Sequence, residues 1–108
     1  EQSHGESFCS LMLHRFRGNG FYVLDEPEAA LSPARQLAVL ARMHQLAQAD
    51  SQFIIATHSP ILMAYPNALI YQITSRGIKQ VRYQETEHYI VTKEFIGNHK
   101  RQLDILLS

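Results

Sequence analysis

The sequence predicts an α/β fold built on parallel strands. Two short apolar runs without polar alternation, residues 21–24 and 53–56, are typical of strands buried on both faces. A helical pattern of apolar residues lies between them. A strand, a helix and a strand in this order form a βαβ unit, whose strands are parallel and usually adjacent. We therefore expect both strands to end at the same edge of one sheet.

The first helix is expected over residues 5–17. Apolar residues recur there at helical spacing, and Gly18-Asn19-Gly20 ends the pattern. Ser3 and Glu6 form an S-x-x-E capping box in front of this helix. A sharper interpretation is that Ser3, Gly5 and the helix N-terminus bind an anion, because the first amides are free and the dipole end is positive. The two interpretations are compatible.

The second helix is expected from Ser32 to about residue 49. Ser32 supplies an N-cap and Pro33 stands at the first helical position. Its apolar face is expected to be marked by Leu37, Leu40, His44 and Ala47. Ser59-Pro60 repeats the same signal and predicts a short helix through about Ala64.

The C-terminal part is expected to hold a β-hairpin and two short helices. Residues 69–74 and 78–83 form the hairpin, with Ser75-Arg76-Gly77 as its turn. The helices lie between residues 85 and 107 and are interrupted near Gly97-Asn98.

Composition excludes several classes of protein. The chain has 108 residues, with 10 basic and 10 acidic side chains, so it lacks the basic excess of a protein whose whole surface binds nucleic acid. A single cysteine, Cys9, cannot form an internal disulfide or a cysteine zinc cluster, and this favours a reducing, cytoplasmic compartment. The apolar stretches are far shorter than the roughly 18 residues of a membrane span.

Polar residues follow both expected strands. Asp25 and Glu26 come directly after the first, at the edge where open parallel sheets generally bind ligands. One carboxylate can hold a magnesium ion, directly or through water, while the other orients an attacking water. A solvated turn explains the dipeptide equally well. His58 follows the second strand, where it could donate a hydrogen bond to a phosphate oxygen or cap the next helix.

Three motifs together resemble the C-terminal half of an ABC-type ATPase with the P-loop NTPase fold. In order, they are Ser3-His4-Gly5-Glu6-Ser7, the strand with Asp25-Glu26-Pro27-Glu28-Ala29-Ala30-Leu31-Ser32-Pro33, and Ile54-Ile55-Ala56-Thr57-His58-Ser59-Pro60. The nearest resemblance is to compact predicted bacterial ATPases of the AAA and ABC kind that lack a fused membrane domain. Residues 1–108 are accordingly expected to be the C-terminal part of one ATPase domain.

The resemblance implies a role for each motif residue. Asp25 is the Walker B residue that binds Mg²⁺ through water, Glu26 is the general base, and His58 is the switch histidine that senses the γ-phosphate of ATP. Ser3, Gly5 and Glu6 correspond to the signature motif, which binds the nucleotide held by the other protomer of a dimer. Ala29 to Pro33, with Ser32, corresponds to the D-loop that crosses the dimer interface.

The sequence departs from the family pattern at several positions. His4 replaces the first signature glycine, Glu6 replaces glutamine, and Ser32 replaces the D-loop aspartate. None of the five glycines is followed by Lys, so the phosphate-binding motif G-x-x-x-x-G-K-[ST] is absent from these residues. We expect the missing N-terminal half to supply that loop, and the isolated chain to hydrolyse ATP negligibly, because positioning of the phosphates supplies most phosphoryl-transfer catalysis.

The sequence also allows functions other than an ATPase. The main alternative is a non-enzymatic adaptor or regulatory module that binds a partner chain through the half-fold. A hydrolase built from Ser59, His58 and Asp25 is disfavoured, because the G-x-S-x-G elbow is absent. Arg76, Lys79 and Arg82 could form a small nucleic-acid patch, although a solvated strand face explains them better.

Overall fold

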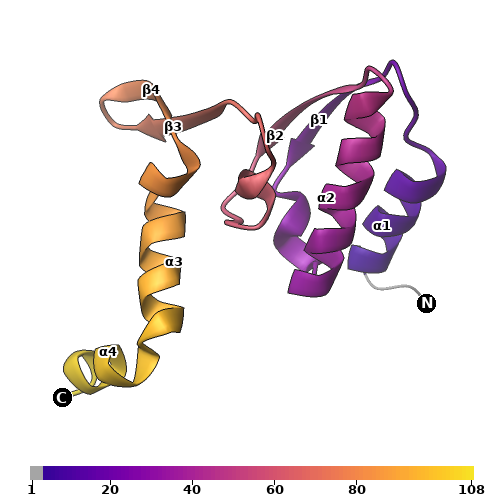
Figure 1. Ribbon diagram of the computed structural model, residues 1–108. Coiled ribbons are helices and arrows are strands. Elements are labelled where there is room, and N and C mark those ends of the chain that lie inside the picture. Colours follow the sequence, from indigo (N-terminus) through magenta and orange to yellow (C-terminus); the bar gives the residue numbers. More distant parts are fainter. Residues whose placement is uncertain (1–3) are drawn as a thin grey trace. The chain divides into compact units, whose positions relative to one another are not determined.

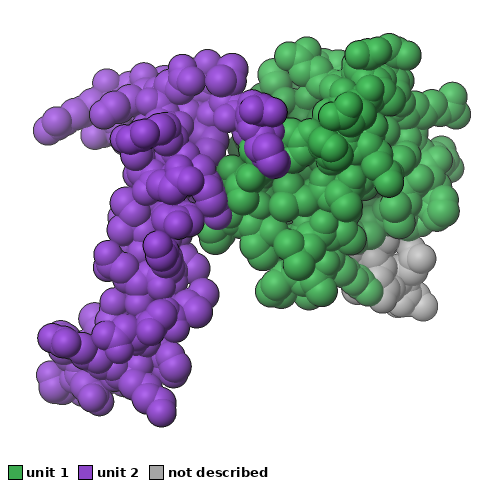
Figure 2. All heavy atoms as spheres, in the orientation of Figure 1, with its two compact units in different colours: residues 1–65 green, residues 66–108 purple. Residues whose placement is uncertain are grey.

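The computed structural model describes the backbone of residues 4–108 and the side chains of residues 8–108. The chain divides into two compact units, Glu1–Tyr65 and Pro66–Ser108, which Figure 2 shows in green and purple.

The first unit contains the expected βαβ arrangement (Figure 1). Helix α1 (His4–His14) precedes β1 (Phe21–Asp25), helix α2 (Pro33–Gln48) and β2 (Gln52–Ala56), with short 3₁₀ helices at Pro27–Ala30 and Leu62–Ala64. The strands are parallel and in register from Phe21 opposite Gln52 to Asp25 opposite Ala56. The predicted α/β class and the parallel pairing of the two strands are therefore confirmed.

Both helices pack on one face of the sheet. The core consists of buried side chains from α1, α2 and the two 3₁₀ regions, namely Met12, Leu31, Val39, Met43, Leu46 and Leu62. From the strands, Leu24, Phe53 and Ile55 pack against this cluster. The other face carries Phe21, Val23 and Ile54, which are 60%, 67% and 55% exposed. The expectation of strands buried on both faces is thus wrong for the described residues, because both helices cover the same side.

The buried face of α2 also differs from the expected one. The structure buries Val39, Met43 and Leu46. Of the four expected residues, Leu40 packs against this core and Ala47 is half-buried, whereas Leu37 is 59% exposed and His44 is exposed. Ser32 does cap the helix as predicted, because its hydroxyl accepts a hydrogen bond from the Arg35 N–H at 3.2 Å.

Arg42 of α2 ties down the C-terminal end of α1. Its guanidinium donates to the carbonyl oxygens of Met12, Leu13 and Phe16 at 3.2, 3.4 and 3.0 Å. Carbonyl groups in the last turn of a helix have no partner within the helix, and a cation there also faces the negative end of the dipole. Arg42 therefore fixes α1 against α2.

The loop from α1 to β1 is held close to the end of α2. The Asn19 N–H donates to the Ala49 carbonyl at 2.8 Å. A Cβ atom on Gly18 would lie 2.7 Å from that same carbonyl oxygen, so glycine is needed for the close approach. The ring of Tyr22 then stacks on Phe16, with ring centroids 4.1 Å apart.

The second unit is a hairpin followed by two helices. Strands β3 (Ile70–Thr74) and β4 (Gly77–Val81) are antiparallel, and helices α3 (Glu87–Gly97) and α4 (His99–Leu106) follow a 3₁₀ turn. Gly77 has φ +120°, a conformation that side chains with a Cβ rarely adopt. The predicted hairpin and the interruption near Gly97-Asn98 are confirmed. Within the described residues, every buried apolar core residue belongs to the first unit.

Candidate functional site

The ends of β1 and β2 meet at one edge of the sheet, as predicted. Asp25 lies opposite Ala56 in the last strand pair, and the Glu26 N–H donates to the Ala56 carbonyl at 2.7 Å. Asp25-Glu26 and Thr57-His58 therefore leave the sheet side by side. Asp25, Glu26 and His58 are all exposed, so a ligand can reach them.

The chain turns sharply at Glu26. This residue has φ 48° and ψ 57°, the left-handed conformation that costs a residue with a Cβ about 1–2 kcal/mol. Pro27 then begins a 3₁₀ helix with its fixed φ. Strained backbone of this kind is concentrated at functional sites, where surrounding contacts hold it in place.

Glu28 joins the two strand ends, which the sequence analysis did not anticipate. Its Oε1 accepts from the Thr57 hydroxyl at 2.7 Å, and its Oε2 accepts from the His58 backbone N–H at 2.9 Å. Partial burial alone would raise the pKa of Glu28, but these two hydrogen bonds lower it overall. The sequence does contain a feature that could have predicted this contact. Glu28 is a third carboxylate shortly after Asp25-Glu26, at the sheet edge where Thr57-His58 is also expected.

The turn after β2 has a second anchor in Ser59. This residue is 4% exposed, and its hydroxyl donates to Gln36 Oε1 of α2 at 2.5 Å. The same oxygen accepts from the N–H groups of Ile61 and Leu62, both at 3.1 Å. Ser59 therefore binds the amides that lead into the 3₁₀ helix Leu62–Ala64, while the N-cap position of that helix is Ile61, and the predicted α-helix does not form.

These contacts weigh against the hydrolase alternative. The Ser59 hydroxyl is committed to Gln36 and to two backbone amides, and the residue is buried. A serine nucleophile needs an exposed hydroxyl that is hydrogen-bonded to its base. Ser59 instead stabilises the turn.

Asp25 and Glu26 offer exposed carboxylate oxygens, which are donors of the kind that Mg²⁺ binds. Among the described residues, no group of three or more His, Cys, Asp or Glu side chains is placed to hold a metal ion. Mg²⁺ usually keeps several waters and binds one or two carboxylates together with substrate phosphates. The exposed carboxylates of Asp25 and Glu26 fit that pattern.

The signature residues are only partly described. Ser3, and with it the capping box, lies outside the described residues. Gly5 and Glu6 belong to the first turn of α1 by their backbone. Their assignment to nucleotide binding stays a prediction, as does that of Ser32, whose hydroxyl caps α2.

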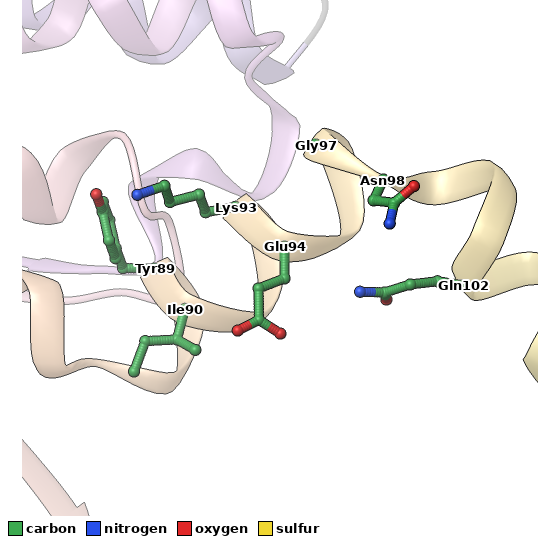
Figure 3. A pocket seen from close by; sticks show the side chains of 7 residues that line it. All are labelled: Tyr89, Ile90, Lys93, Glu94, Gly97, Asn98 and Gln102. Carbon is green, nitrogen blue, oxygen red and sulfur yellow. The ribbon is translucent and has the colours of Figure 1, made fainter.

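The second unit has a surface hollow between its two helices (Figure 3). It measures about 560 Å³ and is lined by side chains of α3 and α4 that include Tyr89, Lys93, Glu94 and Gln102. None of the predicted site residues lies there.

In the suggested basic patch, Arg82 forms an ion pair with Glu85 at 3.6 Å.

A comparison with protein families decides the general class. Residues 8–64 match the model of the family described as "AAA domain, putative AbiEii toxin, Type IV TA system". The match covers 57 of the 108 residues and includes both strands, Asp25, Glu26 and His58. The chain belongs to this AAA domain family.

Membership makes the chain part of a P-loop ATPase-like family whose members generally bind nucleotide and Mg²⁺. The match does not single out the ABC type. It ends close to the boundary of the first unit at Tyr65. No curated protein and no solved structure matches the chain. No helix in the described part of the chain is long and apolar enough to cross a membrane.

Proposed function

We propose that the chain is the C-terminal part of a Mg²⁺-dependent ATPase of the ABC-like kind, which hydrolyses ATP to ADP and phosphate. The observation that carries the proposal is the juxtaposition of Asp25-Glu26 with Thr57-His58 at the carboxyl edge of a parallel sheet, in a chain of the AAA domain family. A separate segment with G-x-x-x-x-G-K-[ST] would complete the domain.

Each residue has a chemical task in this proposal. Asp25 would hold Mg²⁺ through water, and a bound ion would neutralise charge on the phosphates. Glu26 accepts a hydrogen bond and then a proton from the water that attacks the γ-phosphorus. His58 donates a hydrogen bond to a γ-phosphate oxygen. The ADP oxygen leaves opposite the attacking water.

A dimeric, composite site is part of the same proposal. Ser3, Gly5 and Glu6 would contact the nucleotide held by a second copy, and residues 29–33 with Ser32 would lie at the interface. Hydrolysis would then require two protomers to close over two nucleotides. A cytoplasmic location fits the single, unpaired Cys9.

The test compares the isolated chain with the complete domain, in which a phosphate-binding loop precedes Glu1. We expect Mg²⁺-dependent turnover from the complete domain only, and a loss of about a hundredfold or more with Asp25→Asn, since a misplaced metal removes charge stabilisation. Glu94→Gln, an exposed carboxylate in the second unit, is the matched control. Full turnover by Asp25→Asn, or ordinary turnover by the isolated chain, would overturn the proposal.

A binding module is the second candidate, and one observation favours it. The exposed sheet face of Phe21, Val23 and Ile54 is apolar, and such faces mark contact surfaces. Reading the coding sequence upstream of Glu1 distinguishes the candidates. A strand followed by G-x-x-x-x-G-K-[ST] supports the ATPase, and its absence supports the module.

A further inference from the structure

We infer that Glu28 is a positioning residue, whose carboxylate fixes the Thr57-His58 peptide and thereby sets where His58 stands relative to Asp25 and Glu26. The inference deepens the proposed function and relies on it for the role of His58. The two hydrogen bonds that Glu28 accepts from Thr57 and His58, which we call the clamp, are present in the chain without a ligand.

The first step is the pair of hydrogen bonds. Glu28 uses both carboxylate oxygens, one for the Thr57 hydroxyl at 2.7 Å and one for the His58 N–H at 2.9 Å. An ionised acceptor makes such bonds about twice as strong as neutral ones. Two bonds from one rigid, planar group also fix direction, which a single bond does not.

The second step is that Thr57 is held on both sides. While its hydroxyl donates to Glu28, the same oxygen accepts from the Ser59 N–H at 3.0 Å. Ser59 is in turn anchored to Gln36 of α2. The exposed His58 therefore lies between two anchored neighbours, which limit the freedom of its backbone.

Glu28 reaches this turn because of the backbone conformation that precedes it. The left-handed conformation of Glu26 and the 3₁₀ helix that starts at Pro27 bring residue 28 back across the strand ends. The same turn that carries the proposed general base thus also carries the clamp on His58. A change in the backbone conformation of Glu26 would therefore also move the carboxylate of Glu28, because the two residues share one short turn.

The clamp also touches the segment proposed to face a second protomer. Residues 29–33 lie between Glu28 and Gln36, and both of these side chains bind the turn at 57–59. A movement of residues 29–33 would therefore shift Glu28 or Gln36 and, through their hydrogen bonds, the position of His58. This gives the proposed dimer a physical path to the γ-phosphate sensor.

The experiment measures amide hydrogen exchange at His58 by NMR in the full 108-residue chain without nucleotide. Loss of a charge-assisted bond worth about 1.5–3 kcal/mol speeds local opening roughly 10- to 100-fold, so we expect that increase in Glu28→Ala. Thr57→Val should give a smaller increase, about 3- to 10-fold. Its effect should largely vanish when Glu28→Ala is already present, because both changes remove the same bond.

Turnover in the complete domain provides the second readout. Glu28→Ala should lower kcat and leave the KM for ATP within about twofold, because a displaced sensor affects the transition state more than binding. Glu28→Gln, which can accept from the His58 N–H but loses the bond from the Thr57 hydroxyl, should recover part of kcat. Glu94→Gln is the control in both assays.

Hydrogen exchange tests the clamp, and turnover tests the proposed function and the positioning role of Glu28. Unchanged exchange at His58 in both Glu28→Ala and Glu28→Gln overturns the clamp, whatever the ATPase assay shows. Faster exchange with an inactive complete domain supports the clamp and rejects the proposed function. Faster exchange with unchanged kcat rejects the positioning role. If Glu28→Ala does not fold, Thr57→Val carries the exchange test, and unchanged exchange at His58 in that variant overturns the clamp.

Discussion

Replacing Arg42 tests how firmly α1 is fixed to α2. Arg42→Ala removes the donors to the carbonyls of Met12, Leu13 and Phe16, two of which lie within 3.2 Å. A hydrogen bond from a charged donor contributes about 1.5–3 kcal/mol. Because the guanidinium is partly exposed, we expect Arg42→Ala to lower the free energy of unfolding by about 1–3 kcal/mol in total, which is less than the sum over its bonds. For a unit of this size, each kcal/mol corresponds to a Tm change of about 4–8 °C.

Urea denaturation followed by far-ultraviolet circular dichroism measures this loss. Arg42→Lys should recover less than half of it, because a single ammonium cannot reach three carbonyls arranged for the guanidinium fork. Arg76→Ala, on the exposed hairpin turn, should stay within about 0.5 kcal/mol of the original chain. If Arg42→Ala were equally close, the guanidinium would not be what holds the end of α1.

Three further predictions concern the turn, the clamp and the loop. Glu26→Gly should raise the free energy of unfolding by about 0.5–1 kcal/mol, because the relief of the left-handed backbone strain exceeds the entropic cost of ordering a glycine. A loss of stability in urea would show that the backbone at Glu26 is not strained. Because the folded pKa of Glu28 is lowered, its contribution to stability is complete above the unfolded pKa of about 4.3 and is lost as pH falls through the folded value. Stability measured from pH 6 to pH 2 should therefore fall less steeply in Glu28→Gln, and identical slopes would contradict the lowered pKa. Gly18→Ala should cost about 1–3 kcal/mol, because the new methyl collides with the Ala49 carbonyl, and a neutral result in thermal denaturation would mean that the loop relaxes.

The parallel pairing and the position of the site followed directly from the sequence. The runs at 21–24 and 53–56 have no polar alternation, and the cap at Ser32-Pro33 places one helix between them. Right-handed crossover connections then leave little choice of topology. The edge that carries Asp25 and His58 was therefore predictable without coordinates.

The buried face of α2 was not predictable, for a reason that its composition explains. Leu37, Leu40, His44 and Ala47 satisfy the helical spacing as well as Val39, Met43 and Leu46 do. The helix carries apolar residues around much of its circumference, so spacing alone leaves two possible faces. Contact with α1, including the Arg42 bonds to its carbonyls, selects between them.

The clamp by Glu28 was missed because it depends on an unfavourable local conformation. A glutamate in left-handed backbone at position 26 is disfavoured by local sterics, and sequence propensity points to an ordinary turn. The contact joins residues 29 and 30 positions apart. Only the tertiary pairing of the two strand ends makes it possible.

The proposed role of Glu26 as general base can be measured through the kcat of Glu26→Gln in the complete domain, together with the affinity of that variant for ATP. Removal of a general base lowers rates by about 10²–10⁴-fold, while the amide preserves the shape of the side chain. We expect a loss of that size, with the affinity for ATP changed less than about threefold. An unchanged kcat in Glu26→Gln would contradict it and would leave the sheet edge without a catalytic role.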